Sequence, residues 1–321
     1  ALLILHHAIA DGRSRTLFME ALLQSLTSAE YMPRNVSLPP SVDEVARRFG
    51  WNLQEDGHTM KYGIVSRNQP AWPDPEVAAR VEHRHTHVQT LALDCVQQLY
   101  EACHARAVSI TAALCAAMAF VLYEQTRRCG AGDVTFVPCA SVDSRRHLPG
   151  FENVFGSYAF GGKWPCGLSV NACSTFWEVA AQASEGLRGH MVAQRVFDVG
   201  RFHNYAEDLR ELQLSQVRRC GWMSCRSTTR SKKHRRNING AAQGRDASFN
   251  VSNTGPLHRS DQCEFHIAET YSVSSQTSFG TYLFLSAASA HNLLCLSLGA
   301  VYPNVSKRRL AGFASSLAEF I

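Results

Sequence analysis

The chain has 321 residues, of which 45% are hydrophobic and 18% charged, and its formal net charge is +5. This length suits one large domain or two subdomains. Much of the basic excess lies in residues 218–245, which excludes a fold-wide signal for nucleic acid or membrane binding. We expect no signal peptide and no transmembrane span, because the longest apolar stretch, residues 110–123, falls short of the ~18–20 residues that a bilayer requires.

The N-terminal region predicts a strand, a turn and a helix. Residues 1–5 are apolar and predict a buried strand, and apolar residues at helical spacing predict an amphipathic helix over residues 13–27. Gly12 stands at the turn between them. Residues 33–41 predict a loop, and residues 42–49 a short helix.

A connector is expected over residues 64–90, where several prolines interrupt regular structure. It contains three histidines at alternating positions, which would share one face of a strand: His83, His85 and His87. Such a face is either a metal site or a surface strand ahead of the next helix. We favour the surface strand and expect no metal, because no carboxylate or cysteine partner is evident.

The central region predicts helices over residues 93–104 and 108–128, of which the second is apolar nearly all round and therefore buried. Ser109 or Thr111 is expected to cap that second helix. Residues 133–139 then predict a strand, and residues 154–162 a glycine-rich strand or loop.

The C-terminal region predicts a helix over residues 174–191 and a strand over residues 247–253. An antiparallel strand pair over residues 281–287 and 293–301 follows, and then a closing helix whose apolar face carries Leu310, Phe313, Leu317 and Phe320. Mixed helices and strands of this kind predict an α/β (α+β) fold.

Residues 218–245 contain nine Lys or Arg and no apolar periodicity, so we interpret them as a disordered, solvated basic insert. A nucleic-acid or anion patch, a nuclear address, and a sequence that is not native coding sequence remain alternatives. Eleven cysteines without regular spacing, some of them in apolar runs such as Cys115 and Cys295, indicate a reducing, cytoplasmic location.

The segment HHAIADG, residues 6–12, carries the strongest functional signal. A histidine is the natural group to take a proton from a hydroxyl or amine near pH 7, provided that its ring is held in one orientation. Asp11 can supply that order directly or through an arginine, and Gly12 removes bulk where a substrate approaches. The alternative is a strand end with a surface histidine pair, which we consider less consistent with four specified positions in seven residues.

His6-His7-x-x-x-Asp11-Gly12 resembles the HHxxxDG motif of the chloramphenicol acetyltransferase-like superfamily, which includes nonribosomal peptide condensation domains and alcohol acetyltransferases. Residues 134–162 and 249–257 resemble the alcohol acetyltransferases most. The resemblance implies a two-subdomain fold with mixed, largely antiparallel sheets flanked by helices. It also implies that residues 1–63 are the remnant of an incomplete first subdomain and residues 91–321 the second.

The resemblance implies an acyltransferase that moves an acyl group from a thioester donor to an alcohol, without a covalent intermediate. His7 would be the general base, His6 a supporting residue, Asp11 a structural residue paired with an arginine, and Gly12 a residue that keeps the channel open. Donor or substrate binding would fall to Arg145, Arg146, Ser252 and Asn253. The alternatives are a condensation-type domain and a truncated, non-catalytic remnant.

No bound cofactor is expected, and the thioester donor would be acyl-CoA or an acyl group on a carrier protein. The expected partners are a small-molecule alcohol and that donor, with a possible carrier-protein partner and no nucleic acid. Because the motif lies well inside the chain in the superfamily, its place at residue 6 indicates an N-terminally truncated acyltransferase of secondary metabolism.

Overall fold

The computed structural model describes residues 2–7, 9–27, 39–48, 85–127, 132–163, 167–190, 247–257, 265–274, 281–302 and 305–321. The basic insert expected over residues 218–245 and most of the connector lie outside these ranges. Within them no helix is long and apolar enough to cross a membrane.

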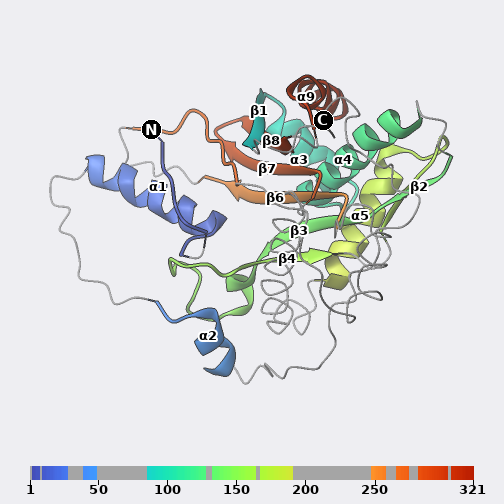
Figure 1. The fold of residues 1–321 in the computed structure, drawn as a ribbon. Coiled ribbons are helices and arrows are strands. Elements are labelled where there is room, and N and C mark those ends of the chain that lie inside the picture. The colour runs from blue at the N-terminus through green and yellow to red at the C-terminus, as the bar shows by residue number, and fades with distance from the viewer. Residues whose placement is uncertain are drawn as a thin grey trace, which may run out of the picture.

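A six-stranded mixed sheet forms the centre of the fold, with the strand order β1-β8-β7-β6-β3-β4 (Figure 1). Its members are β1 (His85–Leu93), β3 (Pro138–Asp143), β4 (Ala159–Lys163), β6 (Phe249–Pro256), β7 (Leu283–Ala290) and β8 (Leu293–Tyr302). The pairs β3–β6 and β6–β7 are parallel, and the other three pairs are antiparallel. A second sheet pairs β2 (Val134–Phe136) with β5 (Leu168–Val170). The predicted α/β class and mixed, largely antiparallel sheets are confirmed.

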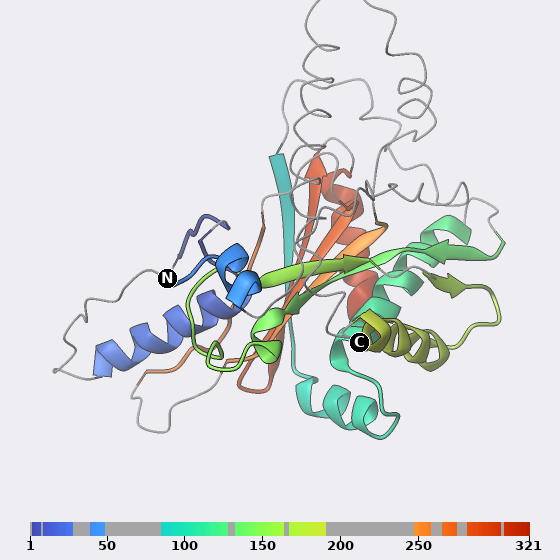
Figure 2. The same ribbon diagram turned by 90° about the horizontal axis from the view of Figure 1, so that it is seen from below.

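Helices lie on both sides of the large sheet (Figure 2). One side carries α3 (Val96–His104), α4 (Ile110–Arg127), α5 (Phe176–His190) and α9 (Lys307–Phe320), and α1 (Gly12–Thr27) lies on the other. The short helix α2 (Val42–Arg48) forms a small apolar cluster through Val45 with Leu148 and Tyr158. The predicted helices are therefore confirmed, with boundaries shifted by a few residues. The short 3-10 helix η1 (Ser144–His147) follows β3.

The main core forms around α4, whose residues Ala112–Ala119 are at most 2% exposed. The helix packs against α5, α9 and β6, and it is apolar on nearly every face, as its sequence predicts. Ser109 is the cap, since its Oγ accepts the Ala112 N–H at 3.1 Å. The apolar face predicted for α9 is also buried, with Leu310, Phe313 and Leu317 at most 1% exposed.

The prediction of a buried strand at the N-terminus is wrong. Residues 2–6 form no regular structure, and Leu2 and Ile4 are 87% and 83% exposed. An apolar run forms a strand only where another strand satisfies its backbone groups, and none of the described strands pairs with this segment. The exposed Phe18 and Leu26 likewise show that the described residues leave much of the apolar face of α1 uncovered.

The strand predicted over residues 133–139 is two strands that belong to different sheets. The chain leaves β2 at Val137, whose N–H donates to Ser248 Oγ at 2.8 Å and whose carbonyl accepts the Ser248 N–H at 2.7 Å. This exchange lets the chain cross from the small sheet into β3 of the large one. β1 begins inside the range predicted as connector, and it carries His85 and His87 as the favoured interpretation of a surface strand expected, whereas His83 lies outside the described residues.

Candidate active site

Asp11, the acidic residue of the motif, lies buried at the N-terminus of α1 and pairs with Arg145 of η1. Arg145 donates from Nη1 to Asp11 Oδ2 at 2.8 Å and from Nη2 to Oδ1 at 3.1 Å, which is a two-pronged contact. Arg145 Nη1 also donates to Asp143 Oδ1 at 2.9 Å. The side chains of Arg145 and Asp11 are 1% and 0% exposed, so this pair is shielded from water.

Backbone donors complete the surroundings of the Asp11 carboxylate. The Ser14 N–H donates to Oδ1 at 2.9 Å, and the Tyr158 N–H donates to Oδ2 at 2.8 Å. Burial acts to raise the pKa of Asp11, but the hydrogen bonds and charge of Arg145 and the two N–H donors outweigh it and lower the pKa below its ordinary value. A carboxylate held in this way orders the turn and is unsuited to accept a proton from a substrate.

Arg145 joins α1 to the loop that precedes β4. Its Nε donates to the Val154 carbonyl at 2.9 Å, and its Nη2 donates to the Gly156 carbonyl at 2.8 Å and to Ser14 Oγ at 3.1 Å. Its guanidinium also lies over the Tyr158 ring, 4.8 Å from the centroid. The sequence offered no reason to prefer Arg145 or Arg146 as the partner of Asp11. The structure brings Arg145 to Asp11 and leaves Arg146 exposed.

Ser14, Gly156 and Tyr158 belong to this cluster, and the sequence analysis did not single them out. Ser14 Oγ donates to the Gly156 carbonyl at 2.6 Å and accepts the Gly156 N–H at 2.8 Å. Gly156 has a φ of +158°, and a Cβ there would lie 2.5 Å from Tyr158 Cε2, so the close approach of the ring requires glycine. The sequence analysis covered Gly156 and Tyr158 only as part of the glycine-rich strand or loop over residues 154–162.

Gly12 lies against β6, where a Cβ would come within 2.5 Å of Thr254 Cγ2. Thr254 Oγ1 donates to the Ala287 carbonyl at 3.2 Å and accepts from Arg15 Nη2 at 3.1 Å, so the threonine cannot easily turn away. The absence of a side chain at Gly12 therefore allows α1 to approach β6. Gly12 also lines the pocket described below.

His6 and His7 lie in an exposed turn before α1, closed by a hydrogen bond of 3.0 Å from the Ile9 N–H to the His6 carbonyl. Asp11 follows them closely in sequence, but neither histidine lines the pocket. The structure thus brings Asp11, Gly12 and Arg145 together and leaves His6 and His7 at the surface.

The end of β6 carries two further predicted residues. Asn253 bonds to α4 and to its own turn: Nδ2 donates to Thr111 Oγ1 at 3.2 Å, and Oδ1 accepts the Gly255 N–H at 3.0 Å. The hydroxyl of Ser252 has no hydrogen-bond partner in the part of the chain that the structure describes. Ser252 is therefore the better placed of the two to donate a hydrogen bond to a ligand.

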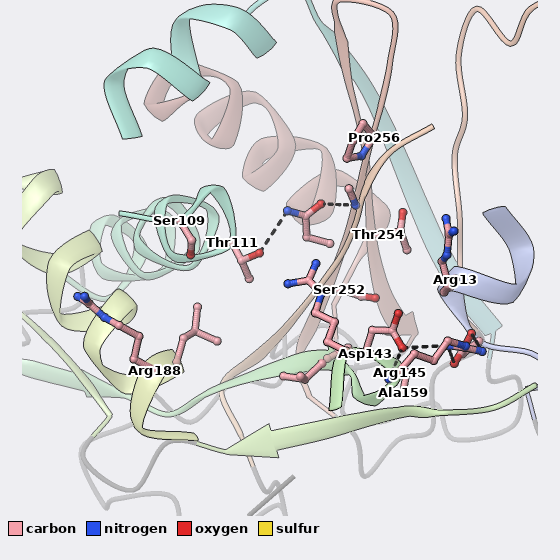
Figure 3. Close-up of a pocket in the computed structure, with 18 of the residues that line it drawn as sticks. Arg13, Ser109, Thr111, Asp143, Arg145, Ala159, Arg188, Ser252, Thr254 and Pro256 are labelled. Carbon is pink, nitrogen blue, oxygen red and sulfur yellow. Dashed lines mark hydrogen bonds and ion pairs between the residues drawn. The ribbon is translucent and has the colours of Figure 1, made fainter. Parts of the chain in front are cut away.

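A pocket of about 1020 Å³ connects these residues (Figure 3). Asp11, Gly12 and Arg13 line it on the α1 side, and residues 252–256 of β6 also border it. Ser109 and Arg188 lie at the opposite end, which Figure 3 shows well separated from Arg13. A pocket of this size accommodates an extended organic ligand. Within the described residues no cluster of three or more metal-ligating side chains occurs.

Comparisons by sequence found no match, neither to a protein-family profile nor to an individual characterised protein. Comparisons by structure found several similar folds. The epimerization domain from the third module of tyrocidine synthetase B matches with a TM-score of 0.54 and 16% identity, over 98% of this chain and 66% of that chain.

Two further structures show the same fold. The first condensation domain of the CDA synthetase gives a TM-score of 0.54 at 17% identity, over 98% of this chain and 62% of that one. Polyketide synthase associated protein 5 from Mycobacterium tuberculosis gives 0.57 at 14% identity, over 98% and 71%. The chain thus has the condensation-domain fold, and it spans slightly less than two thirds of the length of the synthetase domains.

Proposed function

We propose that this chain is the pocket-bearing part of a condensation-type acyltransferase. The observation that carries the proposal is the buried Asp11–Arg145 pair, which fixes the HHxxxDG turn against β6 at the edge of a pocket of about 1020 Å³. The condensation-domain fold supports the same class of reaction. A thioester on a carrier protein would be the donor, and a hydroxyl or amine would be the acceptor.

In the proposed reaction, His7 removes the proton from the acceptor as the acceptor attacks the thioester carbonyl. A hydrogen-bond donor such as Ser252 would stabilise the oxyanion of the tetrahedral intermediate. The carbon–sulfur bond then breaks, and the thiolate takes the proton back from the imidazolium of His7. His7 is exposed in this structure, so the reaction requires its ring to turn toward the pocket when substrate binds.

The test is the rate at which the protein encoded by the whole reading frame consumes a thioester in the presence of an acceptor. We expect His7→Ala to lower kcat by about 10²–10⁴-fold, in the range that general base catalysis contributes. His6→Ala, the matched control one residue away, should lower it much less. If the wild-type protein and His7→Ala are equally slow, the chain is a non-catalytic remnant of the fold and the proposal fails.

An alcohol O-acyltransferase is the second candidate, favoured by the resemblance of residues 134–162 and 249–257 to alcohol acetyltransferases. The same assay separates the two candidates. Turnover of acyl-CoA with simple alcohols supports the O-acyltransferase, whereas turnover only of a carrier-bound thioester supports the condensation-type domain.

A further inference from the structure

The four arginines that line the pocket differ in whether they form ion pairs or hydrogen bonds with other residues. Arg145 pairs with Asp11 and Asp143, and Arg13 donates to Asn153 Oδ1 at 3.1 Å and lies 3.8 Å from Glu20. Arg146 of η1 and Arg188 of α5 also line the pocket, are exposed, and have neither a hydrogen bond nor an ion pair within the described residues. Two guanidinium groups are therefore available to a ligand.

The carboxylates of the pocket do not neutralise these two arginines. Asp11 and Asp143 both bind Arg145, and Glu152 accepts the Gly150 N–H at 3.2 Å. At the far end, which we define as His104, Ser109, Ser184, Leu187 and Arg188, no carboxylate lines the pocket. Arg188 is the permanently charged side chain among these lining residues, and its positive charge favours an anion.

Hydroxyl groups that line the same pocket add donors. Ser109 Oγ accepts the Ala112 N–H as the cap of α4, and Thr111 Oγ1 accepts from Asn253, so both hydroxyl protons remain available. Figure 3 shows Ser109, which directly precedes α4, at the same end of the pocket as Arg188. Guanidinium and hydroxyl donors together suit an oxygen-rich anion such as a phosphate or a carboxylate.

We propose that this pocket selects an anionic ligand whose phosphate or carboxylate groups pair with Arg188 at the far end and with Arg146 of η1. This inference rests on the proposed function for the choice of donor and acceptor probes. It adds to that function the charge of the substrate. The anion could belong to the donor, as a phosphate, or to the acceptor, as a carboxylate. Both sources share the chemistry that the two arginines recognise.

Equilibrium binding, measured by calorimetry at two salt concentrations, tests this inference without turnover. For the donor, the probes are coenzyme A and pantetheine, which share the pantetheine unit, but only coenzyme A carries phosphate groups. For the acceptor, they are succinate and its uncharged diamide. We expect the anionic member of at least one pair to bind more tightly, and its affinity to fall as salt rises. The pair that shows the difference identifies the source of the anion.

Substitution then assigns the binding to the two arginines. Arg146→Gln and Arg188→Gln should each weaken the anionic probe about threefold to tenfold, as expected for partly exposed ion pairs, and leave the neutral probe unchanged. Arg308→Gln is the control, because Arg308 is an exposed arginine on α9 outside the pocket. Equal binding of charged and neutral probes, or equal losses in the control, overturns the inference. A protein that binds the anion yet turns over no thioester would contradict only the proposed function.

Discussion

At the scale of single residues, the Asp11 carboxylate is buried and held in place by hydrogen bonds on both oxygens. It accepts four hydrogen bonds, two from Arg145 and one each from the N–H groups of Ser14 and Tyr158. A buried ion pair is only weak evidence for stability, but removal of one partner leaves the other buried charge with less compensation. The Asp11 side chain therefore holds both the Arg145 guanidinium of η1 and the first turn of α1 in place.

Asp11→Asn should lower the free energy of unfolding by about 1–3 kcal/mol, because the buried Arg145 guanidinium loses one charged partner and keeps Asp143 as the other. Urea denaturation measures the loss. Asp133→Asn, at an exposed aspartate, is the matched control and should change the stability by less than about 0.5 kcal/mol. Equal effects of the two substitutions would show that the Asp11 pair contributes little.

The lowered pKa of Asp11 also predicts a pH dependence. A carboxyl group with a lower pKa in the folded state contributes stability above its unfolded pKa of about 3.9, and that stability is lost as pH falls through the folded value. We expect wild-type stability to decline below pH ~4 and Asp11→Asn to decline less steeply over the same interval. Parallel curves for the two proteins, from urea titrations between pH 3 and 7, would contradict this assignment.

Gly12 and Thr254 form a second residue-scale test. Gly12→Ala should destabilise the protein by about 1–3 kcal/mol, because the new Cβ meets Thr254 Cγ2 at 2.5 Å. Thr254→Ser removes only that methyl group and keeps the hydroxyl that bonds Arg15 and Ala287. In the Thr254→Ser background, Gly12→Ala should be neutral or slightly stabilising, since alanine favours helix over glycine by up to about 1 kcal/mol. A double-mutant cycle with no coupling would disprove the contact.

At the scale of elements, the sequence predicted most helices and strands because their apolar periodicity matches their burial. The closing helix is one example, since Leu310, Phe313 and Leu317 all face the core. The failures arose where pairing partners decide the structure. Local pattern could not show that residues 2–6 lack a partner strand among the described elements, nor that Val137 divides one apolar run between two sheets.

The site shows the same limit. The motif identified Asp11 and Gly12 from spacing alone, but the choice of Arg145 over Arg146 depends on how η1 is placed, which no local pattern specifies. Ser14 and Tyr158 join the cluster through backbone groups or a short hydroxyl contact, and such contacts leave little trace in a single sequence.

Two serines of α9 should respond oppositely to alanine. Ser306 is the N-cap, and its side chain accepts the Arg309 N–H at 3.3 Å, so Ser306→Ala should cost about 1 kcal/mol. Ser315 lies exposed inside the helix and donates to the Ala311 carbonyl at 3.2 Å, so Ser315→Ala should be neutral or stabilise by up to about 0.5 kcal/mol. Thermal or urea denaturation gives the sign of the change in unfolding free energy for each variant. A change of the same sign in both variants would contradict the role of Ser306 as the cap.

At the scale of the whole molecule, α4 ties the two sheets into one unit, since it contacts β5 of the small sheet and β6 of the large one. Leu114 on this helix is 0% exposed. Leu114→Ala should cost about 2–5 kcal/mol, and hydrogen exchange should show equal losses of protection in β2–β5 and in β7–β8. Leu26→Ala, at a site that is 59% exposed, should leave both unchanged. Loss of protection in one sheet alone would mean that the sheets unfold separately.

The pairing of β1 with β8 has a consequence for how the chain folds during its synthesis. His85–Leu93 forms one edge of the large sheet, but its only partner in that sheet, Leu293–Tyr302, leaves the ribosome about 200 residues later, roughly 10–40 s at common translation rates. Throughout that interval β1 has no template, and closing so long a loop is slow. The nascent chain therefore keeps this strand without its partner for tens of seconds, an interval in which its free backbone groups can pair with the wrong segment.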